Sequence, residues 1–174
     1  LVGADMLLGL GLGPAALEQI GAAVGSDVPF LVRGGAQWGE GRGERLRPGA
    51  APPFAAVLVR PEAGLATPDV YRAFDRLPPP PAGAATAPEG FPGLCAWLRN
   101  DLWPAALALR PSLARCARDL RAAGAAGVVM SGSGSCVAGL FPDRAAAEAG
   151  AGRLPGDGFR AVVTPADAGV RPTR

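Results

Sequence analysis

The chain has 174 residues, of which 49% are hydrophobic and 18% charged, with a formal net charge of +2. This length and apolar fraction suit one sizeable globular domain or two small ones. The small net charge gives no reason to expect binding to nucleic acid or to an anionic membrane surface. No run in the sequence approaches the roughly 18 apolar residues of a membrane-spanning helix, so we expect no membrane partner.

Two residue types are missing from the sequence, and their absence excludes several kinds of site. All 17 basic residues are arginine, and there is no histidine. These residues therefore offer no Walker A lysine, no lysine base and no serine–histidine or cysteine–histidine pair. The three cysteines, Cys95, Cys116 and Cys136, are too widely spaced for a disulfide framework or a CxxC metal site. We predict a cytoplasmic protein without a metal site of its own.

The first fifty residues predict helices followed by strands. Pro14 suits the first turn of a helix whose apolar positions follow a 3.6-residue period up to Gly25. The apolar run after Val28 has the length of a short strand. The expected elements are helices over 1–12 and 15–24, strands over 29–32 and 36–39, a return over 41–44, and a boundary within 48–53.

The remaining residues predict alternating strands and helices. Ala55 to Val59 is a continuous apolar run, which predicts a strand buried on both faces. Thr67 is expected to cap a helix that begins at Pro68, and Asp143 to cap the last helix. The expected elements are strands over 55–59, 127–130, 137–141 and 159–163, helices over 67–77, 94–99, 112–123 and 144–151, and a proline-rich loop over 78–92. This order is a split βαβ pattern close to a ferredoxin-like sandwich, so the predicted fold class is α+β.

Two loops carry groups suited to phosphoryl transfer. Asp27, within Gly25 to Phe30, could take a proton from a substrate hydroxyl or orient it toward a γ-phosphate. A plain surface-turn aspartate would have the same local sequence. Ser131-Gly132-Ser133-Gly134 offers amides and hydroxyls for an anion-binding turn, and a flexible hairpin is the alternative. Together the two loops favour a phosphoryl-transfer site.

Three further residues are candidate ligand contacts. Arg42, between two glycines, could clamp a phosphate through its guanidinium group or could be a solvated turn residue. Tyr71 follows Thr67 by one helical turn, so its ring and the threonine hydroxyl could meet one ligand. Core packing by the tyrosine and capping by the threonine explain the same spacing.

The order of these motifs resembles the GHMP kinases. The residues that carry the likeness are Gly25 to Phe30, Gly34-Gly35-Ala36, Gly41-Arg42-Gly43-Glu44, Pro61 to Tyr71, Asn100-Asp101-Leu102 and Ser131-Gly132-Ser133-Gly134. The likeness covers nearly the whole chain, and the joint pattern is far more specific than any single motif. It implies the tail of a ribosomal-protein-S5-like nucleotide-binding domain over 1–50, followed by the ferredoxin-like C-terminal domain of a GHMP kinase over 54–174.

The resemblance also implies an activity and its partners. The reaction is phosphorylation of the 2-hydroxyl of 4-(cytidine 5'-diphospho)-2-C-methyl-D-erythritol by ATP, with ATP-bound Mg²⁺, in the non-mevalonate isoprenoid pathway. Asp27 matches the catalytic aspartate, Tyr71 a tyrosine that packs on the cytosine ring, and Thr67 lies beside it. Arg42 matches a basic substrate contact, and Ser131 to Gly134 match a motif that supports the phosphate region. The resemblance leaves the oligomeric state open.

The chain departs from the family pattern at its start. The family's catalytic lysine and Gly/Ser-rich ATP loop precede the segment that matches Leu1, and the chain contains no lysine. We therefore expect an N-terminally truncated fragment that is inactive by itself. Two alternatives stay open: a non-catalytic ligand-binding or regulatory module built on the ferredoxin-like half, and a GHMP kinase that acts on another small alcohol.

Overall fold

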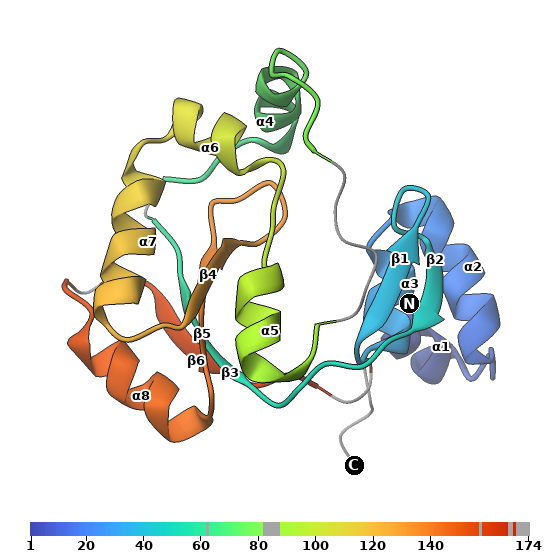
Figure 1. Ribbon diagram of the computed structural model, residues 1–174. Coiled ribbons are helices and arrows are strands. Elements are labelled where there is room, and N and C mark those ends of the chain that lie inside the picture. The colour runs from blue at the N-terminus through green and yellow to red at the C-terminus, as the bar shows by residue number, and fades with distance from the viewer. Residues whose placement is uncertain (62, 82–87, 157, 167–168, 170–174) are drawn as a thin grey trace. The chain divides into compact units, whose positions relative to one another are not determined.

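The computed structural model describes residues 1–61, 63–81, 88–156, 158–166 and 169, which form two compact units (Figure 1). The first unit comprises Leu1–Ala51 with Pro165–Arg174, and the second comprises Pro52–Thr164. The division between them falls inside the proline- and alanine-rich stretch 48–53. None of the helices in the described ranges has the length and apolar character needed to span a bilayer.

The first unit combines three helices with a β-hairpin. Its elements are α1 (Val2–Leu8), α2 (Pro14–Val24), α3 (Val28–Arg33), β1 (Gln37–Glu40) and β2 (Arg45–Pro48), with β1 and β2 antiparallel. Arg33, the last residue of α3, donates hydrogen bonds to the carboxylate of Glu18 on α2 and to the carbonyl oxygen of Leu46 on β2. One guanidinium group therefore joins the helix pair to the hairpin.

The strand that we predicted over residues 29–32 is wrong, because these residues form helix α3. A short apolar run does not distinguish a strand from a buried helix by its pattern. Pro29 stands in the first turn, where its ring is compatible with a helix, and it is buried. Gly21 lets α2 and α3 approach closely, since a β-carbon there would lie 2.8 Å from the Cγ1 atom of Val28. The strand expected over 36–39 is confirmed as β1, while β2 was not predicted.

The second unit is a four-stranded antiparallel sheet with helices on both faces (Figure 1). Its strands are β3 (Ala55–Val59), β4 (Gly127–Met130), β5 (Val137–Phe141) and β6 (Arg160–Val163), in the spatial order β4-β5-β3-β6. Its helices are α4 (Thr67–Phe74), α5 (Gly90–Trp97), α6 (Trp103–Leu109), α7 (Ser112–Ala122) and α8 (Arg144–Arg153). The chain order and strand order are those of a ferredoxin-like sandwich, so the predicted α+β fold is confirmed.

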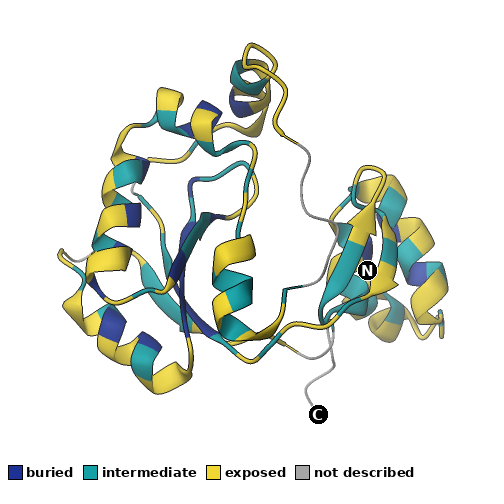
Figure 2. Ribbon diagram, in the orientation of Figure 1, coloured by how far each residue is buried: buried dark blue, intermediate teal, exposed yellow. Residues whose placement is uncertain are grey.

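Strand β3 is buried on both faces, as its continuous apolar run predicts. Ala55 and Val57 pack into a core that includes Phe141 and residues of α7 and α8. Ala56, between them, belongs to a second cluster that residues of α5 cover, among them Leu94. Figure 2 shows buried residues along the central strands and on the helix faces turned toward them.

The local signals at helix ends and in the proline-rich segment had different outcomes. Asp143 caps α8 as predicted, because its Oδ1 atom accepts a hydrogen bond from the amide of Ala146 at 2.8 Å.

Of the loop predicted over 78–92, residues 82–87 lie outside the described ranges, and Gly90 already begins α5. Helix α6 was not predicted, because its uniformly apolar sequence, with Pro104 in the first turn, has no helical periodicity.

Candidate functional site

The Ser/Gly turn joins β4 to β5 in a conformation that requires its glycines. Gly132 and Gly134 have φ angles of 55° and 90°, which other residues rarely adopt. The amide of Ser131 donates to the carbonyl oxygen of Cys136 at 2.9 Å, and the amide of Gly134 donates to that of Ser131 at 3.0 Å. Toward the other described residues, the amides of Gly132 and Ser133 form no hydrogen bond. These two hydrogen bonds close the turn, and the amides of Gly132 and Ser133 stay available to bind an anion.

The side chain of Asn100, in the segment before α6, forms hydrogen bonds to this turn. Its Nδ2 atom donates to the carbonyl oxygens of Met130 at 2.8 Å and of Gly132 at 2.7 Å. Its Oδ1 atom accepts from the amide of Leu102 at 2.9 Å. One side chain thus uses both its donors and an acceptor to fix the start of the turn to the segment that precedes α6. The sequence marked Asn100 only as part of a family motif, because nothing near it in the chain identifies a partner 30 residues away.

Thr67 contacts the same turn, and its predicted role as a helix cap is wrong. Ala66 occupies the capping position of α4, and Thr67 is the first helical residue, without a side-chain capping bond. Its Oγ1 atom instead lies 2.7 Å from the Oγ atom of Ser133, at hydrogen-bonding distance. The hydroxyl therefore ties the start of α4 to the Ser/Gly turn.

Tyr71 lies one turn further along α4, and its ring is accessible. The residue is 52% exposed, whereas the neighbouring Val70 is fully buried and anchors the helix to the core. The tyrosine therefore does not serve as core packing. Its accessible ring suits stacking against a planar ligand, which is the role implied by the family resemblance.

Asp27 lies in the first unit, directly before helix α3 rather than before a strand. The residue is exposed and its side chain makes no capping bond, although its carbonyl oxygen accepts from the amide of Leu31 at 3.1 Å. Toward the rest of the described chain, its carboxylate has no hydrogen-bond or ion-pair partner. The group is therefore free to act on an external hydroxyl.

Arg42 lies at the tip of the β1–β2 hairpin, also in the first unit. Its side chain is 77% exposed, and its Nε atom is 3.9 Å from Oε2 of Glu44. The amide of Arg42 donates to the same carboxylate at 2.8 Å. Hydrogen bonds from the amides of Glu44 itself and of Arg42 lower the pKa of the Glu44 carboxyl below its ordinary value. The guanidinium group of Arg42 is therefore exposed to solvent at the turn.

The cysteines do not add a nucleophile to these groups. Burial raises the pKa of the thiols of Cys95, Cys116 and Cys136. A thiol whose pKa is raised is protonated at neutral pH and unreactive. The structure therefore brings Thr67 and Ser133 together in the second unit with Asn100, and places Asp27 and Arg42 on separate elements of the first unit.

Comparison with known proteins identifies the family. Residues 91–160 match the model that describes the C-terminal domain of GHMP kinases. The chain is 44% identical over 169 residues to the 4-diphosphocytidyl-2-C-methyl-D-erythritol kinase of Salinispora arenicola, a match over 88% of this chain and 53% of the relative. Residues 91–160 therefore belong to the family of GHMP kinase C-terminal domains. The resemblance stated from the motifs is thereby confirmed.

Two further matches extend to nearly the whole of this chain. The enzyme of the same name from Nocardia farcinica is 40% identical over 181 residues, covering 98% of this chain and 59% of the relative. A crystal structure of 4-(cytidine 5'-diphospho)-2C-methyl-D-erythritol kinase matches 98% of this chain and 62% of its own, with a TM-score of 0.70 and 29% identity. The chain thus spans about half the length of the curated relatives it matches.

Proposed function

We propose that these residues belong to a kinase that phosphorylates the 2-hydroxyl of 4-(cytidine 5'-diphospho)-2-C-methyl-D-erythritol with ATP, in the cytoplasm, as a step of the non-mevalonate isoprenoid pathway. The observation that carries the proposal is the 44% identity over 169 residues to a kinase named for this substrate. That match runs through both units, so it includes the regions of Asp27 and of the Ser/Gly turn.

In the proposed reaction, Asp27 positions the substrate hydroxyl and accepts its proton. The oxygen of that hydroxyl forms a bond to the γ-phosphorus of ATP, and the bond from this phosphorus to the β-phosphate oxygen breaks, releasing ADP. Such transfers depend on positioning and on charge stabilisation more than on covalent chemistry. An exposed carboxylate without a partner among the described residues suits this role.

The second unit is proposed to bind substrate and support phosphate groups. The free amides of Gly132 and Ser133 offer hydrogen bonds to phosphate oxygens, in a turn that Asn100 and Thr67 keep in place. Tyr71 is proposed to stack on the cytosine ring, with Thr67 beside it, and Arg42 to contact the substrate.

Mg²⁺ is proposed to enter with ATP, bound through phosphate oxygens, where it neutralises charge on the β- and γ-phosphates. The described residues contain no group of three or more carboxylate or cysteine side chains that could hold a metal ion. The roles assigned to this chain are therefore the proton transfer at Asp27 and the contacts of the turn and of α4.

The test is a phosphorylation assay on the protein as the cell makes it, with ATP and 4-(cytidine 5'-diphospho)-2-C-methyl-D-erythritol, followed by ³¹P NMR of the product. Asp27→Asn should lower kcat about 100-fold or more, the usual effect of losing a positioned acid–base group. The matched control is Asp75→Asn, since Asp75 is an exposed carboxylate at the end of α4. Full activity of the Asp27 variant would exclude the assigned role.

Substrate choice is tested in the same assay. Transfer to another small alcohol in preference to the cytidine diphosphate substrate would identify a different GHMP kinase. Absence of any transfer, with ligand binding retained, would favour a regulatory module.

We further propose that a polypeptide of these 174 residues alone has no kinase activity, because it supplies neither a lysine nor the family's ATP loop. ATP turnover by that polypeptide at the rate of the cellular protein would contradict this.

A further inference from the structure

A cavity of about 380 Å³ opens in the second unit, and none of the residues that line it belongs to the candidate site. It lies beside the ends of β3 and β6 and is bounded by α7. Val59, in its wall, pairs with Arg160 of β6 on one side and with Val137 of β5 on the other. The cavity therefore lies at the same end of the sheet as the Ser/Gly turn, beside β3, which is the direct neighbour of the strand β5 that follows the turn. Its volume is in the usual range for sites that bind small molecules.

The walls of the cavity combine apolar surface with an excess of positive charge. The apolar part includes Leu154 and Phe159, and the latter is 52% exposed. Three arginines and one aspartate, Asp119, line the same space. A mostly apolar wall with a few charged groups is typical of sites for organic ligands, and the excess of arginine favours an anion.

One of the three arginines, Arg160, uses its guanidinium group in hydrogen bonds to the backbone around the cavity. Arg160 donates through Nη1 to the carbonyl oxygens of Ala151 at 2.9 Å and Leu154 at 3.1 Å, and through Nη2 to that of Gly156. These bonds join β6 to the end of α8 and hold one side of the cavity rigid. Arg160 therefore shapes the site and has few donors left for a ligand.

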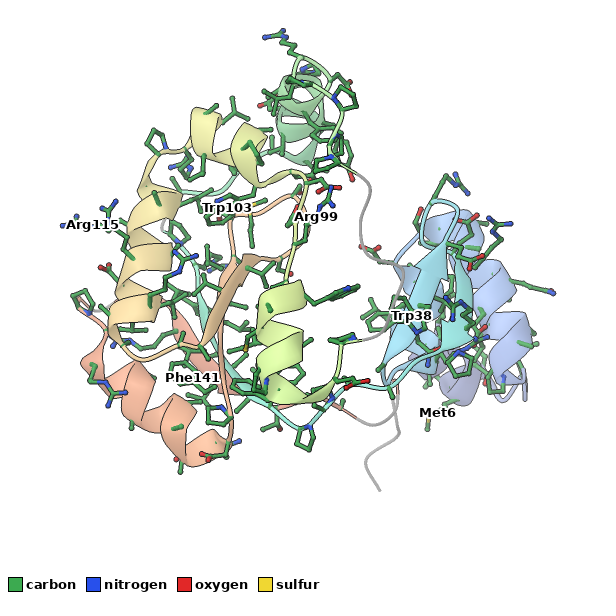
Figure 3. The ribbon with its side chains drawn as sticks, in the orientation of Figure 1. Met6, Trp38, Arg99, Trp103, Arg115 and Phe141 are labelled. Atoms are coloured by element: carbon green, nitrogen blue, oxygen red, sulfur yellow. The ribbon has the colours of Figure 1, made fainter. Side chains whose placement is uncertain are left out.

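The other two arginines keep their donors available. No hydrogen bond or ion pair within the described ranges uses the guanidinium group of Arg60 or of Arg115. The guanidinium carbon of Arg60 lies 5.1 Å from the centre of the Phe159 ring, a cation–π contact that orients the side chain. Arg115 lines the cavity. It is exposed, and its side chain projects outward from α7 (Figure 3). A guanidinium group presents paired donors that match a phosphate or carboxylate.

We propose that this cavity binds a small phosphate monoester with an aromatic or other apolar body. Arg60 and Arg115 hold the phosphate, and Leu154 and Phe159 contact the body. The site is separate from the proposed phosphoryl-transfer site, so its occupation does not depend on kinase activity.

The test is calorimetric titration of the purified protein with phenyl phosphate, with inorganic phosphate and benzyl alcohol titrated separately. Phenyl phosphate should bind more tightly than either, because it alone offers both the anion and the apolar body. Arg60→Gln and Arg115→Gln should each weaken its binding about tenfold or more, since each removes charge-assisted hydrogen bonds. The matched control is Arg118→Gln, because Arg118 is exposed on the same helix and does not line the cavity.

Amide resonances locate the bound ligand. With phenyl phosphate, the amides of Gly158 to Arg160 should shift in the unaltered protein and not in Arg115→Gln. Three results would overturn the proposal: no saturable binding, shifts confined to Ser131–Gly134, or an equal loss of affinity in Arg118→Gln. An equal loss in Arg118→Gln would show that phenyl phosphate is attracted by positive charge in general and does not occupy this cavity.

Discussion

The hydroxyl oxygens of Thr67 and Ser133 lie 2.7 Å apart, which joins the first residue of α4 to a turn 66 positions later. Asn100 holds the same turn through the carbonyl oxygens of Met130 and Gly132. Two side chains from distant parts of the chain therefore set the conformation of the turn whose free amides we propose to contact phosphate.

The Thr67–Ser133 hydrogen bond should be measurable as a coupling energy. Thr67→Val and Ser133→Ala should each lower the free energy of unfolding by about 1 kcal/mol or less, because the pair is exposed and its net contribution is modest. The double variant should lose less than the sum, and the difference is the coupling between the hydroxyls. Urea unfolding of the four proteins measures it. Strict additivity would show that the contact contributes nothing.

Replacing Asn100 should loosen the Ser/Gly turn. Asn100→Ala and Asn100→Asp should both lower the free energy of unfolding by about 1–3 kcal/mol, because two carbonyl oxygens lose their donor. In Asn100→Asp the carboxylate can still accept from the amide of Leu102. If this variant loses less free energy of unfolding than Asn100→Ala, the difference measures the hydrogen bond to Leu102.

Hydrogen exchange at the Gly134 amide reports the same loosening locally. The control is Asp101→Asn, which alters only an exposed pair with Arg99. Unchanged exchange at Gly134 in both Asn100 variants would contradict the positioning role.

Two glycines of α8 should respond oppositely to alanine. At Gly150 a β-carbon would lie 2.5 Å from Cζ of Phe141, which points from β5 into the core (Figure 3). Gly150→Ala should therefore destabilise the protein by about 1–3 kcal/mol through overpacking. At Gly152 nothing lies within 4 Å, so Gly152→Ala should stabilise the helix by up to about 1 kcal/mol. Thermal and urea unfolding compare them. Equal effects at both positions would contradict the packing described for Phe141.

The hairpin turn should show a pH dependence set by Glu44. Amide hydrogen bonds lower the pKa of its carboxyl from the ordinary 4.5. A carboxyl whose folded pKa is depressed stabilises the fold above its ordinary pKa, and the contribution is lost as pH falls through the lower folded value. The NMR shift of the Arg42 amide, which donates to this carboxylate, should titrate with a midpoint below 4.5. Glu44→Gln should abolish that titration, whereas a midpoint at or above 4.5 would contradict the assignment.

Local patterns determined most of the second unit. The apolar run Ala55 to Val59 predicted a strand buried on both faces, and the structure confirms two separate clusters on its two sides. Asp143 was predicted to cap α8 and does so. These features depend on neighbouring residues, whose propensities and hydrogen bonds act within one turn of helix or one strand. The order of such elements was sufficient to predict the ferredoxin-like sandwich.

Only the tertiary structure decided the state of residues 29–32 and the partners of Thr67 and Asn100. The run from Pro29 is helical because α3 packs against α2 at Gly21, a contact that no local pattern encodes. Thr67 has the local sequence of a cap, yet its hydroxyl contacts Ser133. For a short apolar run, helix and strand have nearly equal free energies locally, and a single polar side chain has several local hydrogen-bond partners of similar strength. Contacts that form only when distant segments pack together therefore select among them.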